Sequence, residues 1–134
     1  MALSPGSQLR QLISRGPVLL PGVFNALSAK AAWANGAEAL YLAGSATTNT
    51  LLAMPDIALI TQTEMAQQAS YVCSASPLPT IADADTGYGD VHNVQRTIRE
   101  MERAGLAGVH MEDQESPKRC GHLDGKQLIT PQQM

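Results

Sequence analysis

The sequence is poor in aromatic and charged side chains and holds few cysteines. Only 4% of its 134 residues are aromatic and 16% are charged, while 44% are hydrophobic. This balance excludes a disordered chain, because a disordered chain lacks enough apolar surface to bury. Two cysteines are too few for a disulfide framework. Their scarcity favours a reducing compartment, and we expect a cytoplasmic location.

Basic residues and long apolar runs are also scarce. Nine basic against twelve acidic residues give a net charge of −3. This charge argues against nucleic-acid binding, since neutralising phosphates requires clustered lysine and arginine. The longest uninterrupted apolar run is Ala39–Ala43, far shorter than the ~18 residues that span a bilayer. No apolar stretch suited to a signal peptide follows Arg10 or Arg15. We therefore expect no nucleic-acid or membrane partner.

Apolar residues alternate between helical and strand-like spacing, which is typical of repeated βα units. The spacing predicts helices over 7–15, 26–35, 62–76 and 91–104, and strands over 18–24, 39–42, 80–84 and 108–111. Thr61 and Glu64 have the spacing of a capping box at the start of the third helix. The segments 44–60 and 112–129 are expected to be connections, and a further helix is expected to begin after Thr130.

Parallel strands joined by right-handed crossovers form either an open doubly wound sheet or a closed barrel. A closed (β/α)8 barrel of the TIM type needs roughly 250 residues, so this chain would hold about four βα units. We predict an α/β fold, a parallel (β/α) barrel truncated to those units. Composition and periodicity leave an intact small open sheet as the alternative. Trp33, Tyr41 and Met101 are expected in the core.

Polar residues follow each of the four predicted strands. They are Asn25, Gly44 and Ser45, Asp83 and Asp85, and His110, Glu112 and Asp113. In parallel α/β folds the carboxyl ends of the strands share one face, where ligands bind. Four separate stretches of sequence are therefore expected to meet at one pocket.

Two aspartates stand two residues apart at the end of the third predicted strand. On an extended strand Asp83 and Asp85 would point the same way, roughly 6–7 Å apart. Their charges repel unless a cation lies between them, and such oxygen ligands suit Mg²⁺. The same argument places His110 and Glu112 on one side of the next strand. The alternative is that these residues are helix caps and solvated loop acids.

A cysteine lies among cationic residues after the fourth predicted strand. Lys118, Arg119 and His122 surround Cys120 and favour its thiolate form. Pro117, Gly121 and Gly125 punctuate the segment, as expected of a lid that closes over a substrate. The alternative is an exposed basic loop with an incidental cysteine.

Four short segments occur together in an order typical of one enzyme superfamily. They are Pro55-Asp56, Ala82–Gly89, His110–Gln114 and Lys118–His122. The chain resembles the isocitrate lyase and phosphoenolpyruvate mutase superfamily from about Leu12 to its end, most closely the short methylisocitrate lyase-like members. The resemblance implies that residues 1–134 are the N-terminal part of a single (β/α)8 catalytic domain. It also implies a homo-oligomer, tetrameric in full-length members.

The resemblance further implies a Mg²⁺-dependent lyase, with Mn²⁺ as an alternative ion. Such enzymes cleave methylisocitrate or a related 2-hydroxy di- or tricarboxylate to an α-oxo acid and a dicarboxylate. The implied metal site consists of Asp85 as principal ligand, with Asp83, Glu112 and Asp56 holding the waters. The implied substrate site consists of Ala43, Gly44, Ser45, Asp85, Arg119 and Gly121. Cys120 is implied as the acid–base group, with further catalytic residues Lys118, His122 and His110.

Several branches of the superfamily remain open. Cys120 favours a lyase, because the phosphonate mutase, phosphonopyruvate hydrolase and oxaloacetate decarboxylase branches generally lack this cysteine. Those branches, and an inactive half barrel that only associates, are the alternatives. The chain departs from the family pattern in two places. It has Ala43-Gly44-Ser45 where Ser-Gly is frequent, and Ala58 stands where glycine is usual.

Overall fold

A computed structural model describes residues 3–134, which form a parallel α/β unit. The strands are β1 (Gly22–Val23), β2 (Leu40–Leu42), β3 (Thr80–Asp83) and β4 (Gly108–His110). The helices are α1 (Pro5–Ile13), α2 (Ala26–Ala34), α3 (Gly44–Leu52), α4 (Gln62–Ala75) and α5 (Val91–Arg103). Within residues 3–134 no helix is both long and apolar enough to cross a membrane.

The described residues form one sheet with the strand order β1-β2-β3-β4, and every neighbouring pair is parallel. Tyr41 lies opposite Ile81, and Ala82 opposite Val109. Parallel neighbours require a crossover, and a helix lies between each successive pair of strands. The predicted α/β fold with a parallel sheet is confirmed.

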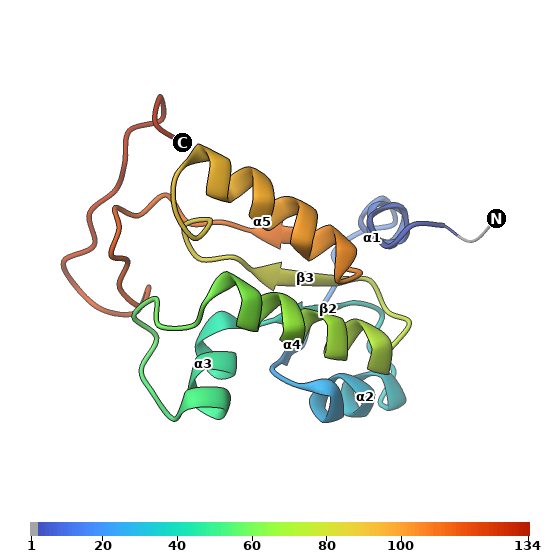
Figure 1. Ribbon diagram of the computed structural model, residues 1–134. Helices are drawn as coiled ribbons and strands as arrows, with labels where there is room; N and C mark the ends of the chain where they lie inside the picture. Colours follow the sequence, from blue (N-terminus) through green and yellow to red (C-terminus); the bar gives the residue numbers. More distant parts are fainter. Residues whose placement is uncertain (1–2) are drawn as a thin grey trace.

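One face of the sheet packs against helices α4 and α5. Leu40 and Leu42 of β2 are fully buried and contact a core that includes Met65 of α4 and Met101 of α5. Figure 1 shows α4 and α5 running alongside the strands. The core position predicted for Met101 is confirmed, whereas that for Trp33 is wrong, because 45% of its surface is exposed.

Helix capping confirms the predicted start of α4 and explains why α1 begins earlier than predicted. Thr61 and Glu64 form the predicted capping box: the Thr61 amide donates to Glu64 Oε2 at 2.8 Å. Helix α1 begins at Pro5, two residues before the predicted start, because Ser4 caps it. Strand β1 is much shorter than predicted, since Pro21 has no amide to pair. After Thr130 only a turn forms, over residues 131–133.

Helix α3 lies where a connection was predicted, so that prediction is wrong. The segment is rich in threonine and asparagine, which ordinarily compete with helical hydrogen bonds. Here the Thr47 and Thr48 hydroxyls donate to the carbonyls of Ala43 and Gly44, at 2.7 and 2.9 Å, one turn earlier along the helix. Both threonines are buried. Tertiary packing therefore supports a helix that local propensity does not predict.

Left-handed backbone marks the loops at the carboxyl ends of the strands. Ala58 has φ 61°, a conformation that glycine adopts with less steric cost. This geometry explains why glycine is usual at that position in the family the sequence resembles. Asp85 and Tyr88, in the turn after β3, have φ values of 45° and 63°. Strain of this kind concentrates at functional sites.

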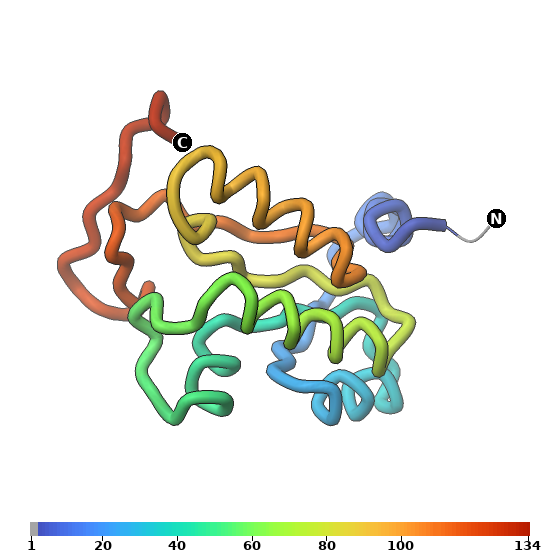
Figure 2. Tube along the Cα trace, in the orientation of Figure 1, coloured from blue at the N-terminus to red at the C-terminus, as the bar shows by residue number. Residues whose placement is uncertain are grey.

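The segments that follow β3, β4 and α3 gather at one end of the molecule. In Figure 2 the orange and red segment after β4 runs beside the green segment between α3 and α4. Lys118 of the first segment contacts Asp56 of the second. The carboxyl ends of the strands thus open toward a shared set of loops, as expected of a parallel sheet.

Candidate active site

A buried lysine links two aspartates from distant parts of the chain. Lys118 Nζ lies 2.7 Å from Asp56 Oδ1 and 2.7 Å from Asp85 Oδ1. The Lys118 side chain has no exposed surface, and the two aspartate side chains are only 13% and 8% exposed. We call Asp56, Asp83, Asp85 and Lys118 the acidic cluster.

The charges of the acidic cluster do not balance. Burial alone would lower the pKa of Lys118, but its contacts with Asp56 and Asp85 outweigh burial and raise the pKa above the usual value. Burial raises the pKa of Asp85, although Lys118 acts in the opposite direction. Three carboxylates thus share one ammonium group. The surplus negative charge can be relieved by a further cation or by protonation of a carboxylate.

Asp83 lies against the start of α3. Its Oδ1 accepts a hydrogen bond from the Asp85 amide at 3.0 Å. Its Oδ2 lies 2.6 Å from the point that a Cβ on Gly44 would occupy. Burial raises the pKa of Asp83, the Asp85 amide and Lys118 lower it, and Glu112 raises it. A glycine at position 44 therefore lets a buried carboxylate approach the helix start.

The predicted extended arrangement of the acids is wrong in detail. Strand β3 ends at Asp83, and Asp85 has a left-handed φ, so the two side chains do not share one extended strand. Strand β4 likewise ends at His110, before Glu112. The acids are brought together by the turn after β3 and not by strand alternation.

Tyr41 and His110 meet at the edge of the acidic cluster. Tyr41 Oη lies 3.2 Å from His110 Nδ1. Burial, then the charges of Asp83 and Glu112, raise the pKa of Tyr41 to about 12. Tyr41 is only half-buried, so its predicted core position is wrong. It is a site residue that sequence patterning missed, although its place near the end of β2 could have indicated it.

Glu112 points to a neighbouring glutamine. Gln114 Nε2 donates to Glu112 Oε2 and, at 3.0 Å, to the Arg119 carbonyl. The Arg119 amide donates back to Gln114 Oε1 at 3.1 Å. Buried Gln114 therefore anchors the loop that carries Arg119. No pattern in the sequence predicts this role.

The remaining predicted catalytic residues lie on the surface loop. Cys120 Sγ lies 3.7 Å from His122 Nδ1, while the Arg119 guanidinium contacts the Asp124 carbonyl at 3.4 Å. Arg119, Gly121 and His122 are exposed. Within residues 3–134 these side chains form no hydrogen bond or ion pair with the acidic cluster. Any catalytic use of Cys120 requires the loop to move toward the cluster.

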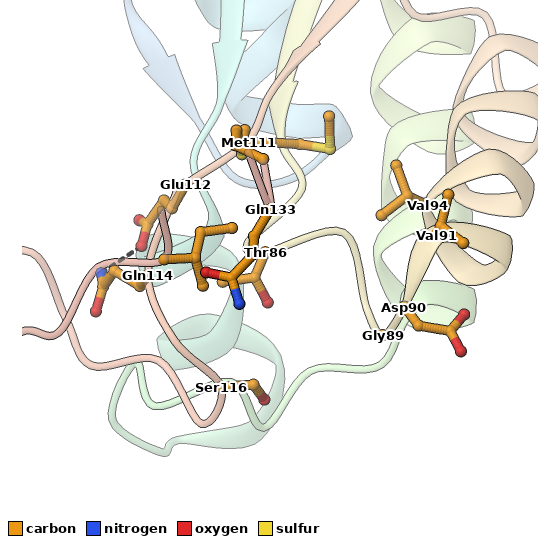
Figure 3. Close-up of a pocket in the computed structure, with 12 residues that line it drawn as sticks. Thr86, Gly89, Asp90, Val91, Val94, Met111, Glu112, Gln114, Ser116 and Gln133 are labelled. Atoms are coloured by element: carbon orange, nitrogen blue, oxygen red, sulfur yellow. Dashed lines mark hydrogen bonds between the residues drawn. The ribbon is translucent and has the colours of Figure 1, made fainter. Parts of the chain in front are cut away.

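A cavity of about 290 Å³ lies between the turn after β3, the start of α5 and the segment after β4. Glu112 and Gln114 line one side and Val91 and Val94 another, as Figure 3 shows. Asp83, Asp85 and Lys118 are not among its lining residues. Glu112 lines this cavity and its charge also acts on Asp83 of the acidic cluster.

The carboxylates are not arranged as a ready-made ligand set. Among residues 3–134, no three or more His, Cys, Asp or Glu side chains are grouped closely enough to hold a metal ion. The Lys118 ammonium lies instead between Asp56 and Asp85. The charge distribution suits a cation, but ligand geometry requires side-chain rearrangement.

Asp83→Asn is expected to stabilise the metal-free chain at pH 7 by about 1 kcal/mol, because it removes a charge that burial disfavours. The raised pKa of Asp83 means that its contribution to stability falls as pH rises through that pKa. The gain from asparagine should therefore shrink on acidification. Urea unfolding at several pH values would measure the effect, with exposed Asp124→Asn as control. A less stable Asp83→Asn variant would contradict the expectation.

The parallel sheet and the acidic cluster at its carboxyl ends define an α/β protein with an enzyme-like site. The family model described as phosphoenolpyruvate phosphomutase matches residues 9–134. The chain belongs to this family, within the phosphoenolpyruvate mutase and isocitrate lyase superfamily, which confirms the resemblance seen in the sequence. A 2-methylisocitrate lyase from Aeropyrum pernix is 53% identical over 131 residues, covering 97% of this chain and 42% of that protein.

Solved structures of relatives share the fold. The chain is similar to an oxaloacetate acetylhydrolase bound to 3,3-difluorooxalacetate, with TM-score 0.92 and 39% identity over 97% of this chain and 45% of the other. It is also similar to a phosphonopyruvate hydrolase in complex with oxalate and Mg²⁺, with TM-score 0.85 and 26% identity over 98% and 44%. The chain thus spans less than half the length of these relatives and has the arrangement of about four βα units of a barrel.

Proposed function

We propose that this chain forms part of a Mg²⁺-dependent carbon–carbon lyase, with Mn²⁺ as an alternative ion. Its substrate is 2-methylisocitrate or a related 2-hydroxy di- or tricarboxylate, cleaved to a pyruvate-like α-oxo acid and a dicarboxylate. One observation carries the proposal: the buried acidic cluster adjoins the start of α3, where Asp83 lies against Gly44. An anion and a cation can therefore be held side by side.

The residues of the acidic cluster fit a hard divalent cation. Mg²⁺ accepts one or two protein carboxylates and keeps several waters, so a closed set of protein ligands is not needed. Asp85 would be the principal ligand, with Asp83, Asp56 and Glu112 holding waters. When bound, the ion would act as a Lewis acid and stabilise the negative charge on the substrate oxygen that becomes the carbonyl of the α-oxo acid.

The start of α3 provides the other half of the site. The N-cap residue Ala43 makes no side-chain hydrogen bond to this helix end within the described residues. The backbone amides of Gly44 and Ser45 are thus free to receive a substrate carboxylate, which the helix dipole favours. Arg119 and Gly121 would approach the substrate when the loop closes. This arrangement orients the hydroxyl-bearing carbon toward the acidic cluster.

The cleavage step moves one electron pair and two protons. The substrate hydroxyl loses its proton to a basic group, its C–O bond becomes a carbonyl, and the adjacent carbon–carbon bond breaks. The electron pair remains on the released carbon, and the Cys120 thiol protonates that carbon. Lys118 keeps Asp56 and Asp85 in place through its two 2.7 Å contacts. His122 and His110 complete the proposed catalytic set.

A second candidate reaction acts on oxaloacetate or on a phosphonate. The structural likeness to oxaloacetate acetylhydrolase, with TM-score 0.92, favours this alternative. Cys120 argues for the lyase, because the carbanion of the leaving dicarboxylate must be protonated. An inactive half barrel is the remaining alternative. We further propose that the chain is the N-terminal part of one (β/α)8 domain in a cytoplasmic homo-oligomer.

A chimera tests the proposal. This chain would replace the 131 matching residues of the Aeropyrum pernix 2-methylisocitrate lyase, so that the site is completed by the rest of that enzyme. Pyruvate release from 2-methylisocitrate, followed with a coupled dehydrogenase, should depend on added Mg²⁺. Turnover of oxaloacetate alone would replace the lyase with the second candidate. A folded chimera inactive on both would favour the inactive half barrel.

A further inference from the structure

Tyr88 carries a buried hydroxyl with no partner. Its ring packs against the hydrophobic core, while its hydroxyl oxygen is buried and has no hydrogen-bond partner among residues 3–134. A buried donor left without a partner costs free energy. Phenylalanine would fill the same space without that cost. The hydroxyl therefore calls for an explanation beyond packing.

The turn after β3 fixes the direction of the Tyr88 side chain. Tyr88 has a left-handed φ of 63°, which is costly for a bulky residue. The Gly87 amide donates to the Ala84 carbonyl at 2.8 Å, and the buried Thr97 hydroxyl donates to the Gly87 carbonyl at 3.0 Å. A Cβ on Gly87 would lie 2.5 Å from Val94 Cγ2. Hydrogen bonds to Ala84 and Thr97 and the close packing of Gly87 against Val94 thus hold the turn that precedes Tyr88.

The Tyr88 hydroxyl is affected by the charges of the acidic cluster but forms no hydrogen bond with it among residues 3–134. Burial, then the charges of Asp85, Asp83 and Asp56, raise the pKa of Tyr88. The charges of these carboxylates act on the hydroxyl, but it forms no hydrogen bond with any of them in the described part of the chain. A bridging water is one way to give such a buried hydroxyl a hydrogen-bond partner.

We propose that Tyr88 is a positioning residue of the metal site: its hydroxyl donates to a water that links it to the carboxylates around the cation. The inference deepens the proposed function and rests on its metal site. It gives the buried hydroxyl a partner and explains why the turn holds a tyrosine in a left-handed conformation. Outer partners of this type commonly support metal affinity.

Tyr88→Phe tests the inference through metal binding, not activity. Titration of the chain with Mn²⁺, with free Mn²⁺ measured by electron paramagnetic resonance, gives the affinity. We expect Tyr88→Phe to bind about tenfold more weakly than the unchanged chain. Tyr71→Phe, the same change on an exposed tyrosine of α4, should bind normally. The relaxation of water protons around bound Mn²⁺ should change only in Tyr88→Phe.

The outcomes separate this inference from the proposed function. No Mn²⁺ binding by the unchanged chain would overturn the metal site and this inference with it. Equal Mn²⁺ affinity of the unchanged chain and Tyr88→Phe would overturn the role of Tyr88 alone. A drop in the melting temperature of metal-free Tyr88→Phe would show that the hydroxyl is a structural donor, which also overturns the inference. Weaker Mn²⁺ binding with an unchanged or higher metal-free melting temperature supports it.

Discussion

Lys118→Met is expected to lower the free energy of unfolding by about 3 kcal/mol at pH 7. Methionine keeps much of the volume but removes the ammonium group that contacts Asp56 and Asp85 at 2.7 Å each. Breaking a buried ion pair on one side leaves uncompensated charge, which is strongly destabilising. Chemical denaturation of the metal-free chain, monitored by circular dichroism, would measure the loss.

The control and the pH dependence isolate the electrostatic cause. Lys30→Met changes an exposed lysine on α2 and should shift stability by less than about 0.5 kcal/mol. Because the pKa of Asp85 is already raised by burial, loss of Lys118 should raise it further. Acidification then protonates the aspartates and should recover part of the lost stability. A deficit that is constant with pH would point to lost packing instead of lost charge.

Cys120→Ser is expected to reduce turnover of the chimera at least ~10²-fold while leaving Mn²⁺ binding intact. A serine hydroxyl holds its proton more tightly than a thiol, and general acid–base assistance contributes factors of this size. Because Cys120 lies on the loop and forms no hydrogen bond with the acidic cluster among the described residues, folding should be little affected. Steady-state pyruvate release from 2-methylisocitrate would measure kcat.

The second cysteine provides a matched comparison. Cys73 of α4 is half-buried beside Gly105, and burial raises its pKa to about 11. Cys73→Ser should therefore cost some stability without a comparable loss of turnover. Near-normal turnover of Cys120→Ser would remove Cys120 from the reaction and leave the loop in a binding role only.

Local signals predicted most of the fold. The spacing of apolar residues gave the order of strands and helices, and Thr61 with Glu64 marked the start of α4, where the capping box forms. Helix α3 escaped prediction, because Thr47 and Thr48 disfavour a helix by local propensity. Their hydroxyls bond backbone carbonyls instead, once packing has buried them.

The sequence predicted which residues occur at the candidate site better than it predicted how they are arranged. The sequence placed Asp83 and Asp85 at the end of β3, but it assumed an extended strand where the chain turns left-handed. Lys118 was expected near the reaction centre as a catalytic group. The structure places the Lys118 ammonium between Asp56 and Asp85, although Asp56 precedes Lys118 by 62 residues in the sequence. The metal and catalytic roles of these residues remain predictions.

The sequence by itself determined the succession of βα units, the family, and the residue types available at the strand ends. These depend on neighbours within a few positions, through periodicity, capping and short motifs. Only the tertiary structure decided which charges share a buried space, that Tyr41 meets His110, and that the Tyr88 hydroxyl lacks a partner. Such contacts join residues far apart along the chain, and their energies depend on burial, which exists only once the sheet and helices have packed.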